Sequence, residues 1–173
     1  MRGQTQNTSD IAKRMFKHAC AFVDCTYFCH TEIPGLKYRM TQTLGIPDIV
    51  LSCFACEVYL KSLLIINGET VEEVRDLKHH IKSLWDKFAQ LDPASAQDFL
   101  NFFSQYYSQQ DFYIIIGKID NNFQDVRYLY ENVSNVETNR LFLLHLCNAL
   151  RNFCCKKIYG CSWNEFVNNG SNW

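Results

Sequence analysis

The sequence lacks several features that would assign it to a familiar class of protein. Its 17 lysines and arginines nearly balance its 18 acidic residues, and the net charge of −1 leaves no global basic field for a nucleic acid. A Gly-rich phosphate loop, a G-x-S-x-G nucleophile motif and internal repeats are all absent from it. We therefore do not expect a P-loop nucleotidase, an α/β-hydrolase or a repeat protein.

A signal sequence and a long apolar run are missing as well. The N-terminal stretch MRGQTQNTSD has no apolar core of the kind that a secretion signal needs. No uninterrupted apolar run approaches the roughly 20 residues that span a bilayer. We therefore expect a cytoplasmic protein that has no membrane segment.

The length and composition are those of one globular domain. The chain has 173 residues, of which 47% are hydrophobic and 14% aromatic, enough for a substantial core. We expect residues 1–8 to be disordered because they are polar. The helical domain is expected over residues 9–160, and in the tail over residues 161–173 Trp163 and Phe166 are expected to dock as a short turn.

Nine cysteines are many for a chain of this length. Their odd number and the missing signal sequence favour reduced thiols over disulfides. Cys53 and Cys56 form a C-x-x-C motif, but it lies inside an apolar stretch, and no second pair has the spacing of a zinc site. We interpret the cysteines mainly as small core residues and expect no metal and no cofactor. A cysteine-based metal or redox protein is the alternative.

The stretch PDIVLSCFACEVYLKSLLIING predicts one long buried helix at the centre of the fold. Pro47 suits the first helical turn, and Gly68 suits a left-handed end. Apolar residues occupy nearly every face between them, which is typical of a helix inside a bundle. Glu57 and Lys61 lie four residues apart on one face. They are either a surface ion pair or a partly buried pair retained beside a binding site.

Shorter helices are predicted after this one. Thr70 and Glu73 have the spacing of a capping box, which predicts a turn of helix there. Apolar residues then recur on one face of residues 81–88, and His79 and His80 stand at the entrance to that helix.

The second half of the chain is also predicted to be helical. Asp92 and Pro93 mark the start of a helix as its cap and first residue. Phe112–Ile116 is rich in β-branched residues, but no partner strand is visible, so we expect a helix with a kink at Gly117. The last helix is expected over residues 140–160. The predicted fold class is all-α, a bundle of four to five long helices.

The order of these features resembles the HEPN superfamily, a group of small helical domains. The resemblance covers about residues 9–155. It rests on three segments of the sequence, namely FACEVYLKSLL (Phe54–Leu64), the helix start His79–His80–Ile81, and NFQDVRYLYE (Asn122–Glu131). The binding candidates in the first two segments are Glu57, Lys61 and His79.

The third segment contains an arginine, two tyrosines and a glutamate: Arg127, Tyr128, Tyr130 and Glu131. Arg127 and Glu131 are four residues apart and can pair along a helix. An arginine flanked by tyrosines can also bind a phosphate and a base. A structural network with Glu57 and Lys61 explains the segment equally well.

A further element of the resemblance lies at the start of the last helix. HEPN ribonucleases share an arginine followed, four to six residues later, by a histidine, and this sequence has RLFLLH from Arg140 to His145. The resemblance implies a metal-independent attack of a ribose 2′-hydroxyl on the adjacent phosphate, in a site formed across a two-fold dimer. His145 would move the proton and Arg140 would hold the phosphate.

Two features of the RLFLLH run differ from that expectation. Leu141 stands where the family usually has a polar residue. Five residues on a straight helix rotate by about 500°, so the side chains of Arg140 and His145 diverge by about 140°. They converge only if Arg140 reaches back from the first turn or if a partner subunit supplies one of them. The alternative is a buried, hydrogen-bonded histidine and a surface arginine.

Two functions follow from these patterns. One is a HEPN-like, metal-independent endoribonuclease of the toxin or defence type that acts on RNA as a homodimer. The other is a catalytically inactive HEPN-like module that binds a nucleotide, RNA or a partner protein. The 13 phenylalanines, 9 tyrosines and 3 tryptophans exceed the needs of a core of this size, so we expect aromatic side chains in a homodimer contact.

Overall fold

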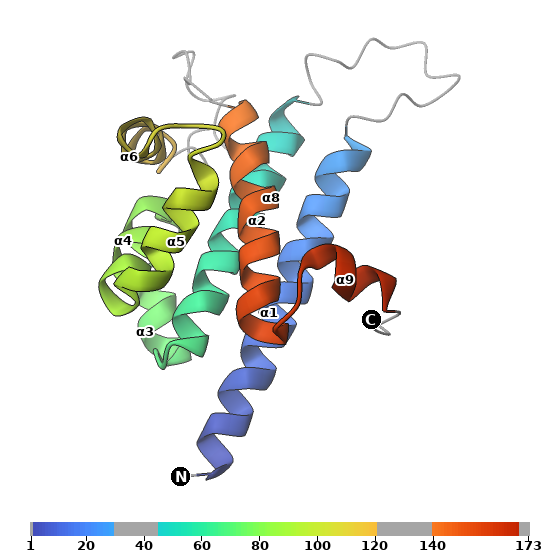
Figure 1. Ribbon diagram of the computed structural model, residues 1–173, viewed down its shortest axis with the longest axis vertical. Coiled ribbons are helices and arrows are strands. Elements are labelled where there is room, and N and C mark those ends of the chain that lie inside the picture. Colours follow the sequence, from blue (N-terminus) through green and yellow to red (C-terminus); the bar gives the residue numbers. More distant parts are fainter. Residues whose placement is uncertain (1, 30–44, 121–139, 170–173) are drawn as a thin grey trace.

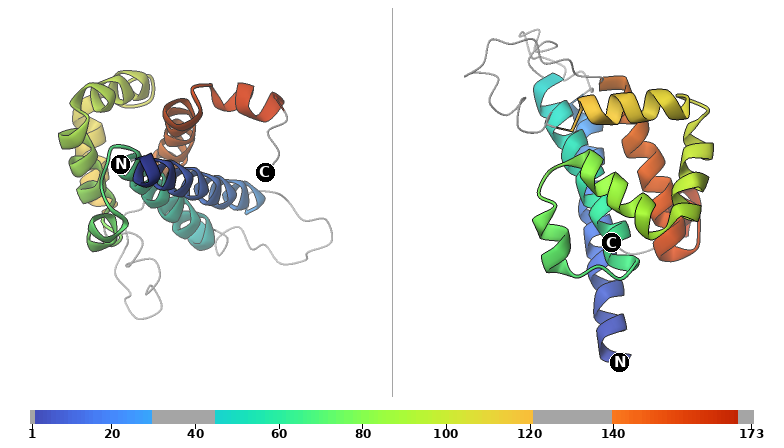
Figure 2. Two further views of the ribbon diagram at one scale, coloured as in Figure 1. Left: turned by 90° about the horizontal axis from the view of Figure 1, so that it is seen from below. Right: turned by 90° about the vertical axis from the view of Figure 1, so that its left-hand side faces the viewer.

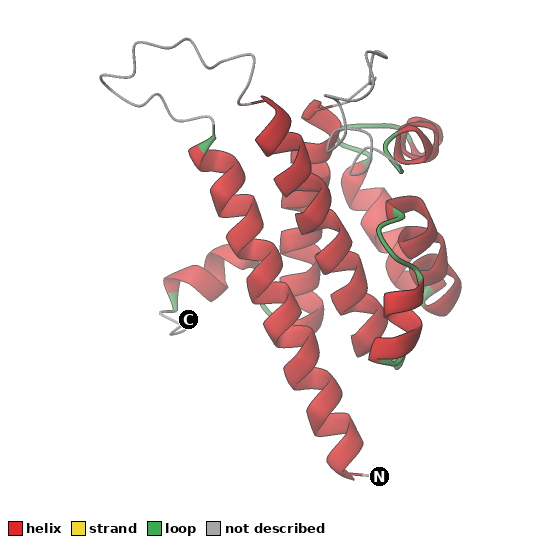
Figure 3. Cartoon of the chain, turned by 180° about the vertical axis from the view of Figure 1, so that it is seen from behind, coloured by secondary structure: helices red, strands yellow, loops and turns green. Residues whose placement is uncertain are grey.

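The computed structural model describes residues 2–29, 45–120 and 140–169, and every regular element in these ranges is a helix (Figures 1 and 3). The predicted all-α bundle is thereby confirmed. The helices are α1 (Arg2–Phe28), α2 (Gly45–Ile66), α3 (Val71–Asp76), α4 (Ile81–Leu91), α5 (Pro93–Phe103), α6 (Gln109–Lys118), α8 (Arg140–Tyr159) and α9 (Trp163–Asn168).

Three long helices, α1, α2 and α8, run side by side and form the centre of the bundle. The shorter helices α4, α5 and α6 cover one side of this group, and α9 folds back beside α1 and α8 on the other (Figure 2). α2 packs against α1, α4 and α8 because apolar residues occupy nearly all of its faces. Large buried side chains from six helices form the core: Phe16, Tyr59, Trp85, Phe88, Phe99, Phe103, Phe112 and Phe142.

The ends of the helices follow the local signals in the sequence. Thr70 and Glu73 form the predicted capping box at the start of α3, and Asp92 caps α5, whose first residue is Pro93. Gly68 has a φ of 101°, so the left-handed end predicted after the central helix is confirmed. α6 is a helix, as predicted from the missing partner strand.

The two ends of the chain agree differently with what the sequence predicts. α1 begins at Arg2, although disorder was expected over residues 1–8. Its first turns are polar and carry no apolar periodicity, so the pattern does not reveal them. At the other end, the expected docking of Trp163 and Phe166 is confirmed, because both lie in the short helix α9 and pack against Phe16 with ring centroids 6.1 and 6.0 Å away.

α2 is also long and apolar enough to cross a membrane. No membrane segment is expected from the sequence, and that expectation stays a prediction. Over the described residues, Pro47–Ile66 passes by length and composition, and 67% of it is buried inside the molecule. Glu57 and Lys61 interrupt the run of apolar residues but leave its average composition apolar. Such a composition is equally typical of a core helix.

Candidate functional site

The structure brings together three of the predicted binding residues, Glu57, Lys61 and His79. One carboxylate oxygen of Glu57, Oε1, accepts a hydrogen bond from Lys61 Nζ at 2.8 Å. The other, Oε2, accepts one from His79 Nδ1 at 3.0 Å. Glu57 is only 5% exposed, whereas 43% of the His79 side chain is exposed. The three residues, hereafter the Glu57 cluster, therefore extend from the interior to the surface.

Local structure explains how the Glu57 cluster forms. Glu57 and Lys61 lie one helical turn apart on α2, which places them on the same face. The short helix α3 ends at Asp76, and Lys78, two residues later, has a φ of 52°. This left-handed residue turns the chain so that His79 lies back over α2. Phe54 contacts the His79 ring edge-to-face, at 6.5 Å between ring centroids.

The Glu57 cluster determines which ring nitrogen of His79 faces the carboxylate. Because a carboxylate oxygen can only accept, Nδ1 of His79 donates to Glu57, and Nε2 lies on the opposite side of the ring, where it can donate to an anion when the ring is protonated. A buried ion pair is weak evidence for stability, since the cost of desolvation can exceed the attraction between the charges. Charged groups arranged in this way beside a half-exposed histidine are a functional-site candidate.

The neighbouring histidine, His80, belongs to a separate network. Its Nδ1 donates to Asp120 Oδ2 at 3.3 Å, and Asp120 Oδ1 accepts from the backbone N–H of Lys82 at 2.6 Å. Asp120 thus caps α4 and holds the chain after α6 against it. The start of α4 already has an anionic partner.

The structure gives Arg140 and His145 different partners. The Arg140 side chain lies at the start of α8 and donates from Nε to the buried carboxylate of Asp48 on α2. The His145 ring stacks on Tyr106, with centroids 4.4 Å apart and the planes at 23°. Tyr106 follows α5, so the two side chains contact different parts of the bundle. This matches the divergence expected from their five-residue spacing.

The environment of His145 favours a ring whose Nε2 is a hydrogen-bond donor and cannot act as a base. Its Nδ1 is buried and has no hydrogen-bond partner among the described residues. A proton there would be a buried donor without an acceptor, so the neutral tautomer with the proton on Nε2 is favoured. A base acting through Nε2 needs the opposite tautomer. The catalytic assignment of Arg140 and His145 stays a prediction.

The remaining predicted binding residues, Arg127, Tyr128, Tyr130 and Glu131, lie outside the described residues. Within the described ranges, no group of three or more histidine, cysteine or acidic side chains is arranged to hold a metal ion. The candidate site therefore consists of the Glu57 cluster.

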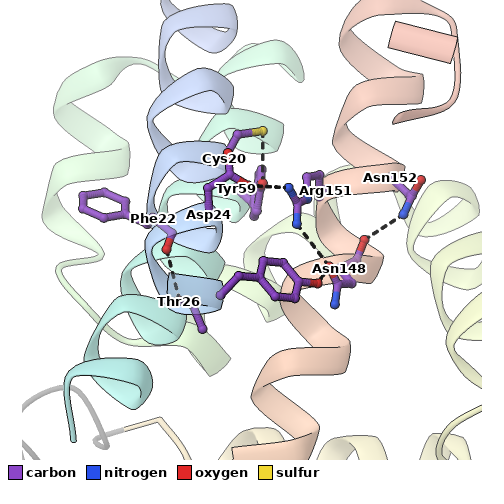
Figure 4. Close-up of polar contacts among 9 residues, drawn as sticks. Cys20, Phe22, Asp24, Thr26, Tyr59, Asn148, Arg151 and Asn152 are labelled. Atoms are coloured by element: carbon purple, nitrogen blue, oxygen red, sulfur yellow. Dashed lines mark hydrogen bonds and ion pairs between the residues drawn. The ribbon is translucent and has the colours of Figure 1, made fainter. Parts of the chain in front are cut away.

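A second polar network is built around Arg151, which the sequence pattern does not single out (Figure 4). Arg151 is only 5% exposed; its Nη1 donates to Asp24 on α1 at 3.0 Å and its Nη2 to Asn148 at 3.2 Å. Asn148 also accepts from the Tyr27 hydroxyl at 2.9 Å. The Arg151 guanidinium lies 4.8 Å from the Trp163 ring centroid, in a cation–π contact. This network joins α1, α8 and α9.

One signal in the sequence points to a buried Arg151. It lies four residues after Cys147 and three before Cys154, on the apolar stripe that α8 turns inward. Its main partner, Asp24, is 127 residues away in the chain, and no local pattern connects them.

Comparisons with protein-family models, with curated proteins and with solved structures give no match.

Proposed function

We propose that this protein is a catalytically inactive HEPN-like module that binds phosphate groups, of RNA or of a nucleotide, at the Glu57 cluster. The observation that carries the proposal is the contact of one buried carboxylate with both Lys61 and His79. Glu57 holds the half-exposed ring of His79 in one orientation, so the side chain does not have to be ordered when a ligand binds. Preorganisation of this kind raises affinity because less freedom is lost on binding.

The charges around His79 favour an anionic ligand. The segment Lys78–Lys82 reads KHHIK, so two lysines flank the histidine pair on the surface. Asp86 and Asp120 balance part of this charge through Lys82 and His80. Lysine and protonated histidine donate charge-assisted hydrogen bonds to phosphate oxygens. A local patch of this kind is what a chain of net charge −1 needs to hold RNA.

The partners of Arg140 and His145 favour binding over catalysis. A phosphate-binding arginine and a proton-transferring histidine must reach the same phosphate. Here the arginine is engaged by Asp48, and the histidine lies flat against Tyr106. Ribonuclease activity remains the rival proposal, through a site that a second subunit completes.

We also propose that the module is a homodimer, and exposed apolar side chains near α8 support this. Leu141 is 57% exposed and lies one turn before His145 on the outward face of α8. Phe102 and Tyr106 are also exposed, and Tyr106 contacts His145 directly. Aromatic residues and leucines that face water in one chain become favourable when a second copy covers them.

Binding is tested by titrating the full chain with a labelled single-stranded RNA and, separately, with adenosine triphosphate. His79→Ala should weaken binding about tenfold or more, because a charge-assisted phosphate contact is worth roughly 1.5–3 kcal/mol. His80→Ala is the matched control, since His80 is the next residue, is similarly exposed and contacts Asp120 instead. Equal losses in both variants would contradict the proposal.

Catalysis is tested by incubating the same RNA with protein in excess EDTA and analysing the ends of any fragments. The proposal expects no cleavage. Fragments with cyclic or 3′-phosphate ends that His145→Ala abolishes, with RNA binding retained, would establish the ribonuclease instead. In that event Arg140→Ala should weaken both binding and cleavage, because a phosphate contact acts in the ground state and in the transition state.

A further inference from the structure

Two core cysteines on different helices are in direct contact. The Sγ atoms of Cys56 on α2 and Cys147 on α8 lie 3.4 Å apart, and 91 residues separate them in the chain. Both side chains are buried, with exposures of 0% and 1%. The two helices run side by side through the centre of the bundle (Figure 1). A bond between the two sulfurs would join the two central helices.

The surrounding hydrogen bonds orient the Cys56–Cys147 pair for that bond. The thiol of Cys147 donates to the backbone carbonyl of Ser52 at 3.3 Å. With its proton used there, Cys147 turns a sulfur lone pair toward Cys56, and the Cys56 thiol donates to it. The next core cysteine along α8, Cys154, contacts oxygen partners instead, the Tyr59 carbonyl at 3.7 Å and the Ser62 hydroxyl at 4.0 Å.

We propose that Cys56 and Cys147 are a site of oxidative modification, at which a peroxide closes a disulfide between α2 and α8. One thiolate attacks the peroxide O–O bond, which breaks to give a sulfenic acid and, with the thiol proton, one water. The second thiol attacks that sulfur and displaces its hydroxyl, which leaves with the second thiol proton as another water. Two thiols are oxidised and one peroxide is reduced.

Burial sets the rate of this reaction. It raises the pKa of the Cys56 thiol well above its usual range, and the contact with Cys147 raises it further. Because the thiolate is the reactive form, oxidation of the closed bundle is slow. The reaction proceeds when the interface between α2 and α8 opens transiently, so it accelerates under conditions that promote opening. Once formed, the disulfide prevents the two helices from separating.

The experiment treats the full chain with hydrogen peroxide, blocks the remaining thiols in denaturant and maps the cross-link by digestion and mass spectrometry. Digestion after lysine and arginine yields a peptide of residues 40–61 and another of residues 141–151. We expect these two to be joined, with fragmentation that places the link at Cys56. The oxidised protein should have a Tm about 10 °C higher, and a reducing agent should reverse the change, since the bond closes a long loop.

Two serine variants form the control. Cys147→Ser should abolish the cross-link and the rise in Tm, whereas the equally buried Cys154→Ser should leave both unchanged. If Cys147→Ser does not fold, Cys56→Ser serves in its place. A cross-link at Cys53, or oxidation confined to the more exposed Cys25 and Cys161, would overturn the proposal.

Discussion

Replacing Glu57 by alanine should destabilise the fold strongly, although it removes only one side chain on one helix. The change deletes the hydrogen bond from Lys61, worth about 2 kcal/mol, and the one from half-exposed His79, worth about 1 kcal/mol. It also leaves the largely buried ammonium group of Lys61 without the carboxylate with which it pairs. We therefore expect Glu57→Ala to lower the free energy of unfolding by about 3 kcal/mol.

Urea unfolding followed by far-UV circular dichroism measures this loss, which corresponds to a midpoint lower by about 1–2 M. The double variant Glu57→Ala/Lys61→Met should recover at least half of it, because an apolar replacement of a buried pair is often neutral. Glu72→Ala is the control. Glu72 pairs with Arg75 on the exposed face of α3, so its loss should cost under about 0.5 kcal/mol. A loss below about 1 kcal/mol in Glu57→Ala, or no recovery in the double variant, would refute the reasoning.

Three further predictions concern backbone strain, acid stability and assembly. Gly68→Ala should lower the free energy of unfolding by about 1 kcal/mol, because φ is 101° there. Lys78→Gly should raise it by about 0.5 kcal/mol, because Lys78 is left-handed. Urea midpoints measure both changes, and two changes of the same sign would contradict this prediction. The hydrogen bonds from Ser95 hold the pKa of Asp92 below its usual range, so its stabilising effect is present above about pH 4 and is lost as pH falls through the lowered native pKa. Asp92→Asn should therefore lower Tm at pH 7 and have less effect near pH 2, and an effect that grows on acidification would disprove this. Leu141→Glu should convert a homodimer to a monomer in sedimentation experiments, whereas Val71→Glu, on the exposed face of α3, should not. A wild-type protein that sediments as a monomer at tens of micromolar would contradict the proposed dimer.

The sequence predicts those parts of the fold that depend on neighbours in the chain. Pro47 and Gly68 mark the extent of α2 closely, and Thr70 and Asp92 cap the helices that their spacing indicates. The contact between Glu57 and Lys61 is equally local, because four residues on a helix share a face.

Contacts across the bundle are not encoded in any local pattern. His79, which donates to Glu57, lies 22 residues further along the chain, and its position depends on the turn at Lys78. Asp24, the partner of Arg151, is even more distant from it in the sequence. For the same reason the RLFLLH spacing indicates the divergence of Arg140 and His145 but not their partners, Asp48 and Tyr106. Those partners are set by how α2 and α5 pack on α8.

The most direct test of the proposed site is to follow the histidine side-chain nitrogens by NMR while the RNA is added. In the free protein, Nδ1 of His79 should carry a proton, since the Glu57 carboxylate accepts its hydrogen bond. On binding, the largest change should occur at Nε2 of His79, with smaller changes at His80 and His145. A largest change at His145, or a His79 ring without a proton on Nδ1 in the free protein, would contradict the assignment of the site to the Glu57 cluster.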